Sequence, residues 1–360
     1  MREAEQCGKQ ASDASWLRGH FWEGAVPEIR QNIITREWVI IATERARRPE
    51  QFKQTGAKKE LPAYDAQCPF CPGNEALAPP ETFRLPRPEA SGGDWQVRVV
   101  PNRFAALSAE GELVRSNVGI KRTMSGVGIH EVIIETPAHN QTTALLSDAE
   151  VVQILGAYQR RYAAAVKDPR VTQVTLFKNH GAAAGASLEH PHSQLIATPL
   201  ISPEVRDRME TALRFYDEEG ECIFCRTLRE ELEEGTRVVL EGEHFTAFVP
   251  FAALTPFHTW IFPKRHNANF AYLDEQEKAD LARVLRRVLL KFYRGLDNPD
   301  YNYIIRTAPH DAARVNYYHW YMSIVPRLTK MAGFELGSGM FINVALPEES
   351  AEFLRGIPVE

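Results

Sequence analysis

The stretch "LEHPHSQLIATPL", residues 188–200, carries two histidines and a glutamine at alternate positions. Side chains at i, i+2 and i+4 of an extended strand share one face, so His190, His192 and Gln194 are expected to point to the same side. Ser193 then faces the other side. Two imidazoles and one amide on one face suit a buried polar network, a metal site, or a nucleophile with a supporting donor.

The chain shows the same order of elements twice. Each copy has a CxxC pair, an apolar strand, a strand that ends in His-Asn, a helix opened by an acidic capping signal, and two more strands, the last containing histidine. His139 and His190 are 51 residues apart, and His266 and His319 are 53 apart. This match indicates an internal duplication. The predicted strands are 95–107, 130–140, 171–179 and 189–199, then 244–254, 258–267, 301–309 and 318–327; the predicted helices are 146–166 and 273–293.

The duplication predicts two metal sites. A structural zinc takes four thiolate or imidazole ligands near tetrahedral geometry. A redox CxxC would open a helix after a strand, whereas "CPFC" follows a polar loop, so redox is the weaker alternative. His244, His258 and His310 have no counterparts in the repeat and are set aside as ligands. The predicted ligands are Cys68, Cys71, His139 and His190 in the first half, and Cys222, Cys225, His266 and His319 in the second.

The two copies differ beside the last metal ligand. Two residues after it, the first half has His192 and the second has Tyr321; two residues further, Gln194 aligns with Ser323. A structural duty would be kept in both halves as easily as the ligands are. The difference suggests that only the first half carries chemistry.

Two other segments suit phosphate binding. The small-residue loop 181–187 lets backbone amides approach an anion, although such a loop is often only a tight turn. Arg45 and Arg48, in "TERARRPEQF", bring guanidinium groups that bind phosphate in pairs of hydrogen bonds, although a solvated basic turn has the same composition.

Composition limits the partners. The 360 residues carry a net charge of −5, with a sequence pI near 6.2, which does not favour nucleic acid or an anionic membrane as a partner. The sequence shows no apolar run of membrane-spanning length, and its first residues lack the apolar region of a secretory signal. We therefore expect a soluble, cytoplasmic protein.

"HPHSQ" after "FKNHGAAAGAS", with "REWVIIATERARRP" (36–49) and "GFELGSGMFIN" (333–343), resembles the galactose-1-phosphate uridylyltransferase family of the histidine-triad superfamily. The resemblance covers about residues 28–355 and is closest to the branch with two CxxC zinc sites, which includes ADP-glucose phosphorylases. It implies an α+β protein of two histidine-triad-like halves, each an antiparallel sheet with helices, joined into one continuous sheet. The expected parts are a flexible tail (1–27), a catalytic N-terminal half (28–202) and a C-terminal half (203–360).

The resemblance also implies roles. His192 is similar to the nucleophile that takes the nucleotidyl group as a phosphoramidate, and Gln194 to the glutamine that hydrogen-bonds the transferred phosphoryl group. Hydrolase branches usually carry histidine at that position, so Gln194 favours transfer. Arg103, where uridylyltransferases have aspartate, and Lys330, one position from the family's lysine, depart from the pattern. The implied binding residues are Arg45 and Arg48 (nucleotide phosphates), Asn102 (nucleoside), Asn179 and Ser187 (phosphate loop), and Gly333, Phe334 and Glu335 (hexose, reaching across from the partner subunit of the family's dimers).

The residue types fit this chemistry. A neutral imidazole is a good nucleophile near neutral pH, and a protonated N–P adduct is a good leaving group. Charge on the transferring phosphoryl group needs donors placed in advance. Zinc on His190 would fix the strand that carries His192.

The leading prediction is a UDP-glucose–hexose-1-phosphate uridylyltransferase. UDP-glucose would modify His192 and release glucose 1-phosphate, and galactose 1-phosphate would then take the uridylyl group. The close alternative is an ADP-sugar phosphorylase with phosphate as acceptor. A zinc-dependent binding module without catalysis explains the cysteines, but not the difference between His192 and Tyr321. The nucleobase, the acceptor, and whether zinc or iron fills each site stay open.

Overall fold

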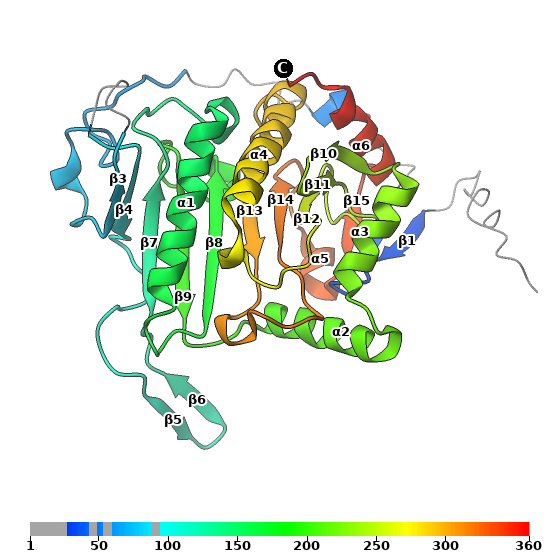
Figure 1. Ribbon diagram of the computed structural model, residues 1–360, viewed down its shortest axis with the longest axis horizontal. Coiled ribbons are helices and arrows are strands. Elements are labelled where there is room, and N and C mark those ends of the chain that lie inside the picture. The colour runs from blue at the N-terminus through cyan, green and yellow to red at the C-terminus, as the bar shows by residue number, and fades with distance from the viewer. Residues whose placement is uncertain (1–26, 43–48, 53–59, 88–93, 360) are drawn as a thin grey trace, which may run out of the picture.

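A computed structural model describes residues 27–42, 49–52, 60–87 and 94–359 (Figure 1). Its main sheet has ten strands in the order β10-β11-β12-β14-β13-β8-β9-β7-β4-β3, and every neighbouring pair is antiparallel. The strands are β3 (Phe83–Leu85), β4 (Val97–Pro101), β7 (Ile129–Ile134), β8 (Gln173–His180), β9 (His192–Thr198), β10 (Val238–Glu241), β11 (Phe245–Phe248), β12 (Thr259–Pro263), β13 (Tyr301–Arg306) and β14 (Tyr321–Pro326).

The strand order is the same when read from either edge of the sheet. From the centre outward, β8, β9, β7, β4 and β3 of the first half correspond to β13, β14, β12, β11 and β10 of the second. The central pair β8–β13 joins the halves, with Ile304 opposite Phe177. The predicted α+β fold, with two antiparallel halves in one continuous sheet, is confirmed.

Two long helices cover one face of the sheet (Figure 1). α1 (Asp148–Ala165) and α4 (Glu275–Gly295) each begin with a capping box, at Ser147 and Asp274 respectively, as the acidic capping signals predict. They pack against each other, and their apolar faces form the main core with the strands beneath them. Since β9 alternates, Leu195 and Ala197 enter this core while His192 and Gln194 lie on the opposite face.

The remaining elements lie around the C-terminal half and at one edge of the main sheet. β1 (Glu28–Gln31), β2 (Trp38–Ile41) and β15 (Phe341–Asn343) form a small sheet, so residues 28–41 pack with the chain's C-terminal part although the sequence places them in the predicted half 28–202. The other helices are α2 (Pro203–Glu219), α3 (Ile223–Glu234), α5 (Gly333–Ser338) and α6 (Pro347–Gly356), with short 3₁₀ helices at Pro49–Phe52, Glu75–Leu77, Thr143–Leu145, Ala182–Ala184, Phe270–Tyr272 and His310–Ala312.

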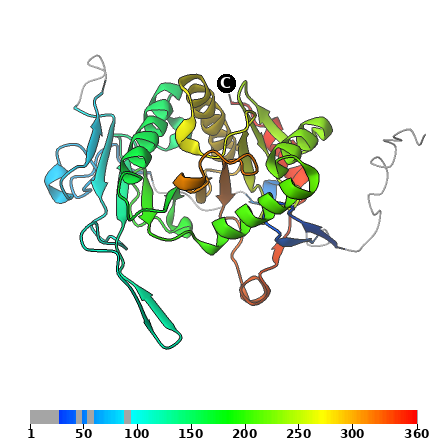
Figure 2. The ribbon, with the colours of Figure 1, turned by 60° about the horizontal axis from the view of Figure 1, so that its bottom comes forward.

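A hairpin of β5 (Arg115–Val118) and β6 (Lys121–Met124) projects from the body beyond β7 and β9 (Figures 1 and 2). No strands are predicted there from the sequence. None of the helices in the described ranges is long and apolar enough to cross a membrane.

Candidate active site and metal centres

The first predicted ligand set is assembled. The ligand atoms of its four residues lie within 4.8 Å of one another, and all four residues are buried. Nδ1 of His190 lies 3.7 Å from Sγ of Cys68 and 3.6 Å from Sγ of Cys71, and Nδ1 of His139 lies 3.5 Å from Sγ of Cys71. Ligand distances of 2.0–2.3 Å in a tetrahedral zinc site place neighbouring ligand atoms about 3.5 Å apart, so the spacing fits.

The surroundings of the first group also fit a cation. The Nε2–H of His190 donates to the carbonyl of Thr136 at 2.8 Å, which leaves Nδ1 free to bind metal. Burial raises the pKa of the Cys68 thiol to about 11, so a thiolate forms there together with a bound cation. Thr136 precedes His139 on the same segment, which ties the two histidine ligands together.

The second ligand set is assembled in the same way. Sγ of Cys225 lies 3.3 Å from Nδ1 of His266 and 3.4 Å from Nδ1 of His319. Unlike the first pair, Cys222 caps α3 and Cys225 lies in its first turn, an arrangement also seen in redox pairs. Two imidazole nitrogens at these distances favour a metal instead. His244, His258 and His310 are not part of either group.

His192 lies beside the first group at the start of β9, with 6% of its surface exposed. Its Nδ1–H donates to the carbonyl of His190 at 2.8 Å, so the lone pair lies on Nε2. Burial lowers the pKa of His192, with a smaller contribution from the Lys178 ammonium group. The Phe70 ring packs edge-on against both His190 and His192, which agrees with the predicted common face. The structure therefore presents a neutral, oriented imidazole.

Gln194 is oriented by a residue that the sequence analysis missed, His130 on β7. The backbone N–H of Ala106 donates to Nδ1 of His130 at 3.1 Å, which leaves a proton on Nε2. That Nε2–H donates to Oε1 of Gln194 at 2.8 Å. Nδ2 of Asn102 approaches the same oxygen at 3.4 Å. With its oxygen occupied, Gln194 keeps its NH₂ group available as a donor.

A signal for His130 was present in the sequence. His258, the residue before β12, lies two positions before the residue that pairs with Ser323, just as His130 of β7 lies two positions before the residue that pairs with Gln194. Nε2 of His258 lies 2.8 Å from Oγ of Ser323. The expectation that His258 has no counterpart in the repeat is therefore wrong. His130 lies nine residues before His139, and His258 eight before His266, so the repeat extends to these histidines as well.

The loop after β8 departs from the expected phosphate cradle. Gly181 has φ of 83°, and a Cβ there would meet Asp300 Oδ1 at 2.0 Å, so the turn requires glycine. The amides of residues 183–186 are already bonded, one to Asp300 and three within the loop. Asn179 is held by Asn302, whose Nδ2 donates to its Oδ1 at 2.8 Å, and Ser187 is exposed. Anion binding at this loop therefore depends chiefly on side chains.

The other predicted binding residues are not beside His192. Gly333, Phe334 and Glu335 begin α5, which packs against β15 in the C-terminal half, away from β9 (Figures 1 and 2). Phe334 is 45% exposed, and Glu335 accepts the Ala332 N–H at 2.9 Å. Arg45 and Arg48 lie outside the described residues.

Two protein-family models match the chain. The model described as galactose-1-phosphate uridyl transferase, N-terminal domain, matches residues 20–202, and its C-terminal counterpart matches residues 208–346. The chain belongs to the galactose-1-phosphate uridyl transferase family. The predicted membership of this nucleotidyltransferase family is confirmed.

Two curated relatives match nearly the whole chain. ADP-glucose phosphorylase of Arabidopsis thaliana is 36% identical over 351 residues, covering 96% of this chain and 97% of that protein. Galactose-1-phosphate uridylyltransferase of Thermotoga maritima is 30% identical over 342 residues, covering 92% and 99%. The crystal structure of the Arabidopsis thaliana ADP-glucose phosphorylase with bound ADP-glucose has a TM-score of 0.77 at 32% identity, covering 93% of this chain and 100% of that chain.

Behind His192, on the core face of β9, lies a buried polar network. The Tyr158 hydroxyl donates to Oγ of Ser193 at 2.7 Å, lies 2.5 Å from the Tyr303 hydroxyl and reaches Glu135 at 3.2 Å. Lys178 forms an ion pair with Glu135. Burial alone would raise the pKa of Glu135, but Lys178 holds it below its ordinary value. The network thus contains a true buried ion pair.

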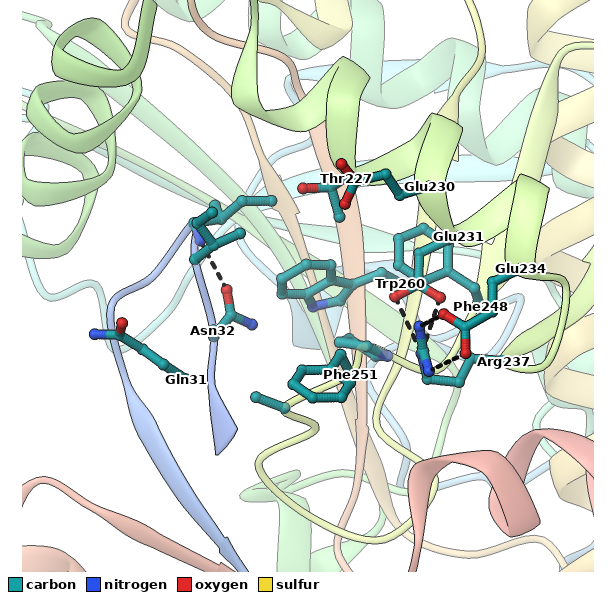
Figure 3. A pocket seen from close by; sticks show the side chains of 14 residues that line it. Gln31, Asn32, Thr227, Glu230, Glu231, Glu234, Arg237, Phe248, Phe251 and Trp260 are labelled. Carbon is teal, nitrogen blue, oxygen red and sulfur yellow. Dashed lines mark hydrogen bonds and ion pairs between the residues drawn. The ribbon is translucent and has the colours of Figure 1, made fainter. Parts of the chain in front are cut away.

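A cavity of about 270 Å³ lies in the C-terminal half (Figure 3). Its walls include Phe248 and Trp260, which the register aligns with Val100 and Val132 beside Gln194. Its Arg237 is paired with carboxylates of the same cavity. None of its lining residues belongs to the predicted site, so the second half carries aromatic bulk where the first half has small side chains.

Proposed function

We propose that this protein transfers a nucleotidyl group from a nucleoside diphosphate sugar to a phosphate-bearing acceptor through His192. Nε2 of His192 attacks the α-phosphorus, the bond to the bridging oxygen breaks, and the sugar 1-phosphate leaves. An acceptor phosphate oxygen then attacks the same phosphorus, and the N–P bond breaks. The observation that carries this proposal is the orientation of His192, whose Nδ1 is fixed by the His190 carbonyl.

Gln194 supplies a donor for the phosphoryl oxygens. Because His130 occupies its Oε1, its NH₂ group points its protons at the transferring group as charge develops there. An amide does not take a proton from water at neutral pH, which favours transfer over hydrolysis. Asn179 and Ser187 add donors at the loop, and Arg45 and Arg48 are proposed for the nucleotide phosphates.

Zinc is the proposed occupant of both Cys/His groups. Two thiolates and two imidazoles with no open position are typical of a structural site. Cys68, Cys71, His139 and His190 would hold it next to the nucleophile strand, and Cys222, Cys225, His266 and His319 would hold it in the second half. At both sites the zinc would supply folding stability and rigidity.

Two substrate pairs remain candidates. The galactose-1-phosphate uridylyltransferase reaction, UDP-glucose with galactose 1-phosphate, agrees with the description of both family models. The ADP-sugar phosphorylase reaction is favoured by the higher identity to the Arabidopsis thaliana ADP-glucose phosphorylase, 36% against 30%. We therefore expect ADP-glucose to react faster.

We also propose a cytoplasmic homodimer. Gly333, Phe334 and Glu335 lie apart from β9 within one chain, and Phe334 is half-exposed. A partner subunit that brings its α5 to this His192 would complete a hexose site, as the family resemblance implies.

The test is covalent labelling. The protein is incubated with ADP-glucose or UDP-glucose that is radiolabelled at the α-phosphorus, and label retained on the denatured chain is measured over time. Label on wild type and none on His192→Asn is expected, with release by phosphate or galactose 1-phosphate identifying the acceptor. Discharge by water as fast as by any acceptor would mean a hydrolase.

A further inference from the structure

We propose that the buried network of Lys178, Glu135, Tyr158 and Ser193 is a positioning device for His192, and this inference rests on the proposed function of His192. The side chains lie on the core face of the sheet and do not touch substrate. They act through the backbone on either side of the nucleophile.

Both chain neighbours of His192 are held by this network. The Glu135 N–H donates to the carbonyl of Pro191 at 3.1 Å, and the Tyr158 hydroxyl donates to Oγ of Ser193 at 2.7 Å. Glu135 joins these two contacts, because its carboxylate reaches the Tyr158 hydroxyl at 3.2 Å. The main chain of Glu135 therefore holds the residue before His192, and the Tyr158 hydroxyl holds the side chain of the residue after it. The Glu135 carboxylate anchors both.

The network also links the strands around the nucleophile. Lys178 lies on β8, next to Asn179, and pairs with Glu135, the residue after β7. Thr143 donates to the same carboxylate at 3.0 Å. β7 and β8 are the two neighbours of β9 in the sheet. The ion pair thus ties together the strands that flank β9.

The second half provides an internal control. Its register aligns Met322 with Ser193, Ile305 with Lys178 and Pro263 with Glu135, and all three of these residues are buried. The same fold is therefore built there with apolar side chains. A buried ion pair is often no more stabilising than apolar residues of similar size. The half that has His192 keeps the ion pair, whereas the half that has Tyr321 does not.

Small displacements of a nucleophile have large effects on rate. Misplacement of a reacting group by about 1 Å can lower the rate on the order of 10²-fold. The neighbours of His192 are fixed by short hydrogen bonds, and its own Nδ1–H is held by the His190 carbonyl. The geometry leaves the imidazole little freedom to move along the strand.

The central test replaces the ion pair with apolar residues, as in the second half, in the double variant Glu135→Leu/Lys178→Met. Single-turnover labelling with ADP-glucose or UDP-glucose, whichever labels wild type, gives the first-order rate constant at saturation and the half-saturating concentration. We expect the variant to fold with unchanged metal content and half-saturation, and its rate constant to fall by about 30–100-fold. Met322→Ala, at the position matching Ser193, should lower the melting temperature and leave the rate constant within twofold.

A second set of variants keeps the test informative if the double variant does not fold. Ser193→Ala removes the acceptor of the Tyr158 hydroxyl, whereas Tyr158→Phe removes that hydrogen bond together with the contacts to Tyr303 and Glu135. Ser193→Ala should slow labelling by about 5–10-fold, Tyr158→Phe by at least as much, and the double variant no more than Tyr158→Phe alone. Ser193→Thr, which keeps the hydroxyl, should restore most of the rate. Additive losses, or a rate within twofold of wild type in every variant, would overturn the positioning role. A wild type that forms no adduct would instead overturn the proposed function itself.

Discussion

The two halves of the molecule share one scaffold and differ on both faces of a single strand. On the face of the sheet away from α1 and α4, here called the open face, β9 carries His192 and Gln194 where β14 carries Tyr321 and Ser323. On the core face, Ser193 joins a polar network where Met322 packs in an apolar core. The features common to both halves are those that the fold needs. The features confined to the first half are those that we propose for nucleotidyl transfer.

The metal groups are the clearest common feature. Each half keeps two cysteines and two histidines whose ligand atoms lie within 4.8 Å of one another, although the first CxxC lies in a loop and the second opens α3. A catalytic metal would not have to be repeated beside Tyr321. Duplication of the whole Cys/His set therefore supports the proposed structural role for a metal in each half and the proposed assignment of the chemistry to His192.

The largest expected effect comes from the nucleophile. His192→Asn should lower the rate of transfer on the order of 10⁵–10⁶-fold, the scale seen when the nucleophile of a covalent mechanism is removed. Its fold and metal content should not change, because His192 lies outside the ligand set. Tyr321→Phe, the matched change in the second half, should transfer at the wild-type rate. An equal loss in both variants would erase the proposed division between the halves.

The metal sites come next. Cys71→Ser and Cys225→Ser should each lower the zinc content, measured by atomic emission, from about two to about one per chain. Binding of a structural zinc contributes on the order of 10 kcal/mol to folding. Its loss should lower the melting temperature by about 10 °C or more. Chelated wild type should melt lower still. Metal-free protein with an unchanged melting temperature would contradict both sites.

Gln194→Ala sharpens the comparison on the open face. Loss of one donor to the transferring group should slow adduct formation about 10²–10³-fold. Ser323→Ala, its counterpart, should have less than a twofold effect, because nothing is transferred beside Tyr321. Single-turnover labelling of the two variants side by side measures both. A Gln194→Ala variant that labels as fast as wild type would remove the glutamine from the mechanism.

Features that leave a local or a repeated pattern in the sequence could be predicted from it. Both Cys/His groups could be predicted, because each of their eight residues has a partner at nearly the same spacing in the other half. Helices α1 and α4 could be predicted because their caps and apolar periodicity are local. The strand that carries His192 followed from alternation alone.

Features that depend on distant contacts were missed. Lys178 and Glu135 look like ordinary exposed charges in sequence, and only the pairing of β7, β8 and β9 buries them together. β2 pairs with β15 from the other end of the chain, so residues 28–41 lie with the C-terminal half. The hairpin β5–β6 is exposed on both faces and has no apolar alternation to reveal it. His130 was readable from the repeat, but its role required the contact with Gln194.

The smallest expected effect distinguishes His130 from His258, the residue at the corresponding position of the second half. His258 is buried against Ser323, and burial lowers its pKa to about 3. Below pH 6.5 the unfolded chain binds a proton at this site that the folded protein does not, so stability falls as the pH drops. Between pH 6.5 and 5.0 this amounts to about 1.5 kcal/mol. In His258→Gln, the free energy of unfolding measured by chemical denaturation should fall between these two pH values by that amount less than in wild type. The rate of transfer should not change.

His130→Gln should instead slow transfer, because Gln194 loses the donor that fixes its oxygen. If His258→Gln slows transfer as much as His130→Gln does, the second half takes part in the chemistry and the comparison between the halves fails.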